Sequence, residues 1–101
     1  MKYNGFYYWM CQSSIKKVLL EKYDKEYATQ IAKKSKRVYR ELVENADDIG
    51  ADNPMAYNEL FALVFVAPYV ASEKKISPET VQEMMRRALY HVKWYFNRTD
   101  L

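Results

Sequence analysis

The side chains in this sequence best suited to catalysis are one histidine and one cysteine, His91 and Cys11. His91 has Arg87 one turn before it and Tyr95 one turn after it, so no carboxylate or cysteine stands at the spacing of a metal-ligand pair. We interpret His91 as a partly buried structural histidine. Cys11 lies among hydrophobic residues and is interpreted as a small core side chain. The two could act as nucleophile and base only if the first and last helices meet there.

The cysteine count limits the chemistry further. A single cysteine excludes an internal disulfide and a cysteine-cluster metal site. The sequence also contains no zinc-ligand spacing, no glycine-rich phosphate loop and no serine–histidine–aspartate order. We therefore predict no metal and no cofactor, and we assign no catalytic residue.

The most site-like polar stretch is the turn Asp52-Asn53-Pro54, which Asn58 and Glu59 follow about one turn later. Amides at a helix N-terminus attract carboxylates and other anions, and Asn58 and Glu59 come just before the buried run, where they could be partly sheltered. The alternative is that Asn53 only caps the helix while Asn58 bonds to the neighbouring loop. Asparagine before proline favours this second interpretation, because capping is its usual role.

A basic cluster occupies the polar side of the second predicted helix: Lys33, Lys34, Lys36, Arg37 and Arg40. Arg37 with Glu41, and Arg40 with Glu44, have the i,i+4 spacing of helix ion pairs. The whole chain has 16 basic and 13 acidic residues, a net charge of only +3. A solvated face with ion pairs is therefore favoured over a phosphate-binding surface, and we predict no nucleic-acid partner.

Exposed aromatic residues near arginine point to a different kind of site, a protein interface. Tyr90 and Trp94 lie one turn apart on the face of the last helix opposite its apolar stripe, with Arg87 beside them. Such residues are typical of interface anchors. We predict that a second copy of the chain or a further C-terminal segment covers them. The alternative is that the aromatic residues 6–9 fold back over Trp94 within the same chain.

Four predicted helices must position these groups, because hydrophobic residues recur with the helical period in four segments. The expected helices span about residues 6–23, 25–45, 54–72 and 78–96. The chain has two glycines and three prolines, so tight β-turns are scarce. We predict an all-α, four-helix bundle-like fold that forms one domain over residues 1–101.

Capping residues mark where these helices begin. Asp24 is the expected N-cap of the second helix, and Asn53-Pro54 and Ser77-Pro78 place a cap before a proline at the first helical position. The third helix carries an apolar run over residues 60–67, so we expect other helices to cover it on every side. Pro68 should kink this helix, because its ring removes a backbone hydrogen bond.

The cellular location follows from the absence of targeting patterns. No segment reaches the ~20 apolar residues that cross a bilayer, since the longest apolar run ends near Ala71 and contains Pro68. Only Lys2 precedes the aromatic stretch at residues 6–10, and no small-residue cleavage pattern follows it. With the unpaired Cys11, the sequence predicts a cytoplasmic protein without a membrane partner.

The order of several short segments resembles the N-terminal half of the L-2-amino-thiazoline-4-carboxylic acid hydrolase family. The segments are Leu19-Leu20-Glu21-Lys22-Tyr23, then Glu26-Tyr27-Ala28 and a helix, then Ile49-Gly50-Ala51-Asp52-Asn53-Pro54 leading to Asn58, and Ile76-Ser77-Pro78-Glu79. Together they cover roughly residues 15–96. The resemblance implies hydrolytic opening of a small cyclic amidine-like substrate to an N-carbamoyl-cysteine type of product.

The resemblance also limits which roles can be transferred. Family members resemble one another most in a C-terminal half rich in cysteine and acidic residues, which has no counterpart before Leu101. No catalytic role is therefore carried over, and only Asn53 and Asn58 match the family's loop and helix start, as substrate-side contacts. We predict an N-terminal helical domain without an active site of its own. The alternatives are a small helical module that dimerises through its aromatic surfaces and, less favoured, a nucleic-acid binder.

Overall fold

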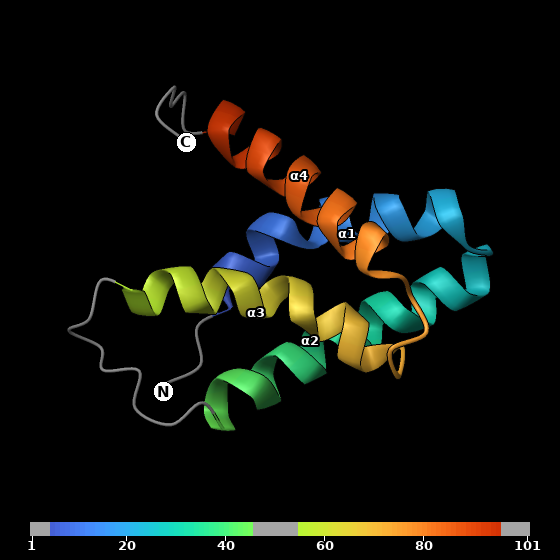
Figure 1. Ribbon diagram of the computed structural model, residues 1–101, viewed down its shortest axis with the longest axis horizontal. Helices are drawn as coiled ribbons and strands as arrows, with labels where there is room; N and C mark the ends of the chain where they lie inside the picture. Colours follow the sequence, from blue (N-terminus) through green and yellow to red (C-terminus); the bar gives the residue numbers. More distant parts are fainter. Residues whose placement is uncertain (1–4, 46–54, 96–101) are drawn as a thin grey trace.

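The computed structural model describes residues 5–45 and 55–95, without the side chains of residues 55–59 and 94–95. These two ranges form four α-helices and contain no strand (Figure 1). The helices are α1 (Phe6–Lys22), α2 (Lys25–Asn45), α3 (Met55–Ala71) and α4 (Pro78–Tyr95). The all-α, bundle-like prediction is confirmed, and the predicted helix ends agree within two residues.

Two of the described helices are central and two are peripheral. α1 contacts α2, α3 and α4, and α3 likewise contacts the three other helices, whereas α2 and α4 do not touch each other. In Figure 1, α2 and α4 accordingly lie on opposite sides of the pair α1 and α3. The two central helices therefore carry most of the interfaces that hold the described part of the chain together.

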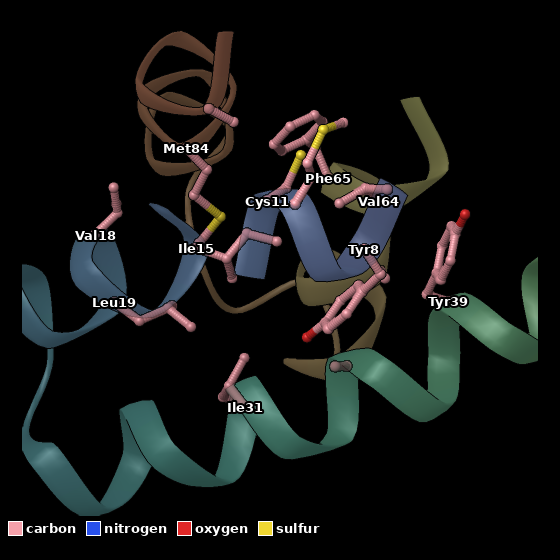
Figure 2. Packing of buried hydrophobic residues seen from close by; sticks show 14 of the residues in the cluster. Tyr8, Cys11, Ile15, Val18, Leu19, Ile31, Tyr39, Val64, Phe65 and Met84 are labelled. Carbon is pink, nitrogen blue, oxygen red and sulfur yellow. The ribbon is translucent and has the colours of Figure 1, made fainter. Parts of the chain in front are cut away.

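The hydrophobic core draws side chains from all four helices. The buried cluster includes Cys11 and Ile15 of α1, Tyr39 of α2, Phe65 of α3 and Met84 of α4, and each of them is fully buried (Figure 2). Burying a large apolar side chain contributes about 1.5–3 kcal/mol relative to leaving it in water. The core thus supplies the main favourable term in the folding of this domain.

Tyrosine takes part in this core, which explains some of the ten tyrosines in the sequence. The rings of Tyr8 and Tyr39 stack with their centroids 5.6 Å apart, and Tyr8 reaches from α1 towards α2 (Figure 2). The Tyr8 hydroxyl donates a hydrogen bond to the Ala32 carbonyl of α2 at 3.0 Å. Because its polar end has a partner, the ring can be buried without an unsatisfied donor.

Side-chain caps start α2 and α4 as predicted. The Asp24 carboxylate accepts a hydrogen bond from the Tyr27 amide at 2.9 Å, and the Ser77 hydroxyl accepts one from the Thr80 amide at 3.1 Å. Each bond satisfies an amide that has no partner within its own helix. The third predicted cap, Asn53, lies outside the described residues.

The turn between α3 and α4 has a geometry that the sequence did not indicate. The Glu73 amide donates to the Val70 carbonyl and the Lys74 amide donates to the Tyr69 carbonyl, each at 2.9 Å. This pair of bonds is the Schellman motif that ends many helices. Glu73 and Lys74 have φ values of 57° and 65°, in the left-handed region where glycine is favoured.

The coverage of α3 differs from our expectation. Val66 and Val70 are 41% and 43% exposed, so the prediction that neighbouring helices cover this helix on every side is wrong. Its buried side instead carries Val64 and Phe65, because three neighbouring helices enclose only part of a helical surface. The helix continues through the buried Pro68 and ends at Ala71, so the proline lies in its last turn.

Candidate functional site

His91 lies on the surface of α4, beside a shallow hollow of about 270 Å³ that Trp9, Gln12 and Ser13 of α1 also line. Its side chain is exposed, so the expectation of a partly buried histidine is wrong. The reason is the helical register. Ala88 and Val92 occupy the buried side of α4, and successive helical positions are 100° apart, which turns His91 towards solvent.

Cys11 is buried completely in the core, as the sequence indicated. Burial disfavours the charged thiolate and raises the pKa of Cys11 to about 12. Although α1 and α4 do pack together, Cys11 does not line the hollow beside His91. At neutral pH the thiol stays protonated, and a protonated thiol is a poor nucleophile. The structure therefore does not assemble the nucleophile pair considered above.

Arg87 forms a charged bridge between α4 and α1. Its guanidinium donates to both carboxylate oxygens of Glu21 at 2.7 and 2.6 Å, and to Glu83 at 2.8 Å. Glu83 also accepts two hydrogen bonds from Arg86, the shorter at 2.6 Å. These hydrogen bonds join the Arg87 guanidinium to groups of its own chain. If Arg87 also has its predicted role at an interface, it contacts a partner while keeping these bonds.

The network changes the acidity of its members. Hydrogen bonds from Arg86 and Arg87 lower the pKa of Glu83 to about 2, and the hydrogen bond from Arg87 lowers the pKa of Glu21. The same bonds raise the pKa of Arg87. All members are thus ionised at neutral pH, and the network acts as a structural tie between two helices that are far apart in sequence.

The predicted aromatic interface is described only in part. Tyr90 is 73% exposed, so no described residue covers most of its ring. Trp94 lies in α4, but its side chain falls outside the described part. Two aromatic residues of α1 have different surroundings: Tyr7 makes an edge-on contact with Phe61 of α3, with ring centroids 6.5 Å apart, and Trp9 lines the hollow beside His91 of α4. As far as the described residues extend, the face of α4 that carries Tyr90 is therefore exposed.

The two candidate substrate contacts cannot be placed as a site. Asn53 lies outside the described residues, and Asn58 lies in the first turns of α3 with a side chain that is not described. Their assignment as substrate-side contacts stays a prediction.

The basic face of α2 is exposed, as predicted. Arg40 pairs with Glu44 at 3.1 Å, which confirms one of the two expected i,i+4 ion pairs. The pair between Arg37 and Glu41 is not among the ion pairs of the described residues. Pairing therefore neutralises only a small part of this basic surface.

A groove with a volume of about 610 Å³ lies between α1 and α2. Four lysines line it: Lys16 and Lys17 from α1, and Lys33 and Lys36 from α2. The basic cluster predicted from sequence contains the α2 lysines but not Lys16 and Lys17 of α1. A sequence pattern did exist, because Gln12, Ser13, Lys16 and Lys17 form one polar face of the first helix.

Neither a metal site nor a membrane span is found among the described residues. No group of three or more histidine, cysteine, aspartate or glutamate side chains in that part of the chain is placed to hold a metal ion. Among the described helices, none has the length and apolar content needed to cross a bilayer.

Comparisons with known proteins were made at the level of family, sequence and fold. No protein-family model matches the chain, and neither curated proteins nor solved structures give a match. The chain's own side chains and their arrangement are therefore the basis on which a function can be proposed.

Proposed function

We propose that this chain is a helical binding domain without an active site of its own, the N-terminal part of a cytoplasmic protein resembling L-2-amino-thiazoline-4-carboxylic acid hydrolase. In this proposal the domain supplies a binding surface, and a cysteine-containing C-terminal half supplies the groups that open the cyclic amidine. Asn53 and Asn58 would contact the substrate from the side of this domain.

The burial of Cys11 is the observation that carries the proposal. Hydrolysis through a covalent intermediate needs a nucleophile that reaches the substrate, and the single thiol of this chain is closed off in the core. Its raised pKa, about 12, further lowers its reactivity at neutral pH. The large side chains that do reach the surface, such as Trp9 and Tyr90, are suited to binding.

The experiment compares residues 1–101 with the product of a longer reading frame. Each is incubated with L-2-amino-thiazoline-4-carboxylate, and mass spectrometry detects the addition of one water. We expect no turnover by residues 1–101 and turnover by the longer product, unchanged by Cys11→Ala. Turnover by residues 1–101 that Cys11→Ala abolishes would overturn the proposal. A reading frame that stops at Leu101 would also overturn it and would favour the alternative below.

The alternative is a module that dimerises and has no enzymatic activity, and one observation specifically favours it. Seven large hydrophobic side chains are more than 40% exposed. Leu20 lines the groove between α1 and α2, and the other six are Phe6, Trp9, Val66, Val70, Leu89 and Tyr90. Monomers expose few such residues in contiguous patches. Sedimentation at rising concentration tests this alternative. A dimer weakened by Tyr90→Ala with Trp94→Ala, but not by Val66→Ala with Val70→Ala, would locate the interface on α4.

A further inference from the structure

The groove between α1 and α2 combines positive rims with an apolar wall. Its four lysines come in equal number from the two helices, and no acidic residue lines it. The apolar part consists of Tyr8, Leu20 and Ala32. The Tyr8 hydroxyl is already bonded to the Ala32 carbonyl. Tyr8 is only 4% exposed and Ala32 is half-buried, so a ligand meets mainly the 41% exposed Leu20 on the apolar wall, with positive charge on either side.

The groove is elongated along the helix axes. Its α1 residues recur every three or four positions from Tyr8 to Leu20, which corresponds to about 18 Å at 1.5 Å per residue. Its α2 residues extend from Thr29 to Lys36, two turns of the neighbouring helix. A groove between two helices, about three turns long, has the dimensions of a third helix laid alongside them.

The position of the charges selects among anionic ligands. Lys16 and Lys17 stand on one helix and Lys33 and Lys36 on the other, so the positive charge is spread over both rims. A fatty acid carries one charged head group and would use only one end of such a distribution. A nucleic-acid strand carries charge along its length, but its backbone offers no apolar stripe to the wall formed by Tyr8 and Ala32.

We propose that this groove binds an acidic amphipathic helix of a partner protein. Leucine-like side chains of that helix would lie against Leu20 and Ala32, above the buried Tyr8, and flanking aspartate or glutamate would meet the four lysines. Complementary charge at a rim speeds association and fixes orientation, while the apolar wall supplies contact area. The proposal does not depend on the hydrolase resemblance, and its test measures binding without any turnover.

The probe is a fluorescein-labelled helical peptide of four turns, with leucine at i, i+3, i+4 and i+7 and glutamate on both flanks. Fluorescence anisotropy with residues 1–101 should show saturable binding that weakens as salt rises. A peptide with lysine in place of glutamate, and one with the leucines dispersed, should bind at least about tenfold more weakly. Absence of saturable binding at low salt, or equal binding of the three peptides, would overturn the proposal.

Matched charge reversals separate the groove from general basic character. Lys16→Glu with Lys36→Glu reverses two lysines inside the groove, and Lys34→Glu with Arg37→Glu reverses two exposed cations of α2 outside it. Both pairs change the net charge by the same amount. We expect a loss of about tenfold or more in the first pair and less than about threefold in the second. Equal losses would overturn the proposal.

Two further measurements keep the test decisive. Circular dichroism checks that each variant folds, and the corresponding glutamine variants replace any pair that does not. Leu20→Ser removes an exposed apolar contact without changing charge and should weaken binding of the leucine-containing peptide. An oligothymidylate or vesicles of phosphatidylglycerol that displace the peptide more effectively than unlabelled peptide does would assign the groove to nucleic acid or to a membrane surface instead.

Discussion

At the scale of single residues, Cys11 shows how burial determines reactivity. Its thiol is fully enclosed, and its pKa is raised to about 12 by the loss of solvation. We expect a thiol reagent at pH 8 to label the folded protein at least about a hundredfold more slowly than the unfolded protein, because both thiolate and access are lacking. Absorbance during labelling measures the two rates.

The control for this prediction is an exposed cysteine on the same helix. Ser13→Cys in a Cys11→Ala background places a thiol on the solvent side of α1 and should label at the rate of an unfolded chain. Rapid labelling of Cys11 in the folded wild type would show that the core opens there or that the residue is not buried.

The charged bridge around Arg87 predicts an acid-dependent loss of stability. The pKa of Glu83 is lowered from 4.5 to about 2 by hydrogen bonds from Arg86 and Arg87, so the folded state binds the proton more weakly than the unfolded state. Its stabilising effect is present above pH 4.5 and disappears as the pH falls towards 2. The midpoint of thermal unfolding should therefore decrease over this range, and Glu83→Gln should reduce that decrease.

Glu41→Gln serves as the comparison, since Glu41 is an exposed carboxylate of α2 outside this network. It should leave the pH dependence close to that of the wild type. If the midpoint of thermal unfolding decreased equally in Glu83→Gln and wild type, the hydrogen bonds from Arg86 and Arg87 to Glu83 would contribute nothing measurable in solution.

The sequence predicted the burial or exposure of some of these side chains and not of others. The burial of Cys11 followed from its hydrophobic neighbours in sequence, and the exposure of Tyr90 followed from its position opposite the apolar stripe. The exposure of His91 was missed because the width of the buried stripe is set by which helices pack against α4. The ion pair of Arg87 with Glu21 joins residues 66 positions apart, and no local pattern indicates it.

At the scale of elements, the end of α3 contains an unfavourable backbone conformation that one substitution can relieve. Glu73 occupies the left-handed position of the Schellman motif with φ 57°, where a side chain is disfavoured by about 1 kcal/mol relative to glycine. Glu73→Gly should therefore raise the free energy of unfolding by about that amount. Glu73→Ala removes the same charge but keeps the Cβ atom, so the difference between the two variants in thermal unfolding isolates the backbone effect. No gain over alanine would mean that the turn relaxes to another conformation.

The two sides of α3 should respond differently to charge. Val64 is fully buried, whereas Val66 is 41% exposed on the same helix. Val64→Asp would bury a carboxylate without a partner, at a cost of several kcal/mol that approaches the total stability of a small domain. Val66→Asp should leave the fold intact and cost less than about 1 kcal/mol. Circular dichroism and thermal unfolding measure both, and equal effects would contradict the observed orientation of α3.

Helix starts were the most predictable elements, because a cap acts within four residues. Asp24 and Ser77 were assigned from sequence, and both accept the expected amide hydrogen bonds. The turn after Ala71 was not predictable, since the residue in its left-handed position is glutamate instead of the usual glycine. The exposed side of α3 was missed for a related reason: an apolar residue type does not reveal whether a neighbouring helix is present.

At the scale of the whole molecule, the sequence predicted the number and order of the helices but not their mutual placement. The groove between α1 and α2 depends on which faces the two helices turn outwards, and that is decided by the packing of Tyr8 and Ile15 in the core. Lys16 and Lys33 are 17 positions apart in sequence, so their appearance in one groove is a property of tertiary structure. The candidate site therefore emerged only with the fold.

The central position of α1 has a consequence for how the chain is made. Ile15, Val18 and Leu19 belong to α1, which is made before the other three described helices, yet they reach full burial only against partners that include α4, the last of the four to be made. During synthesis these side chains stay exposed to solvent until the residues up to Tyr95 have left the ribosome. We expect nascent chains arrested before Pro78 to be cleaved by protease within α1, and released full-length chains to resist.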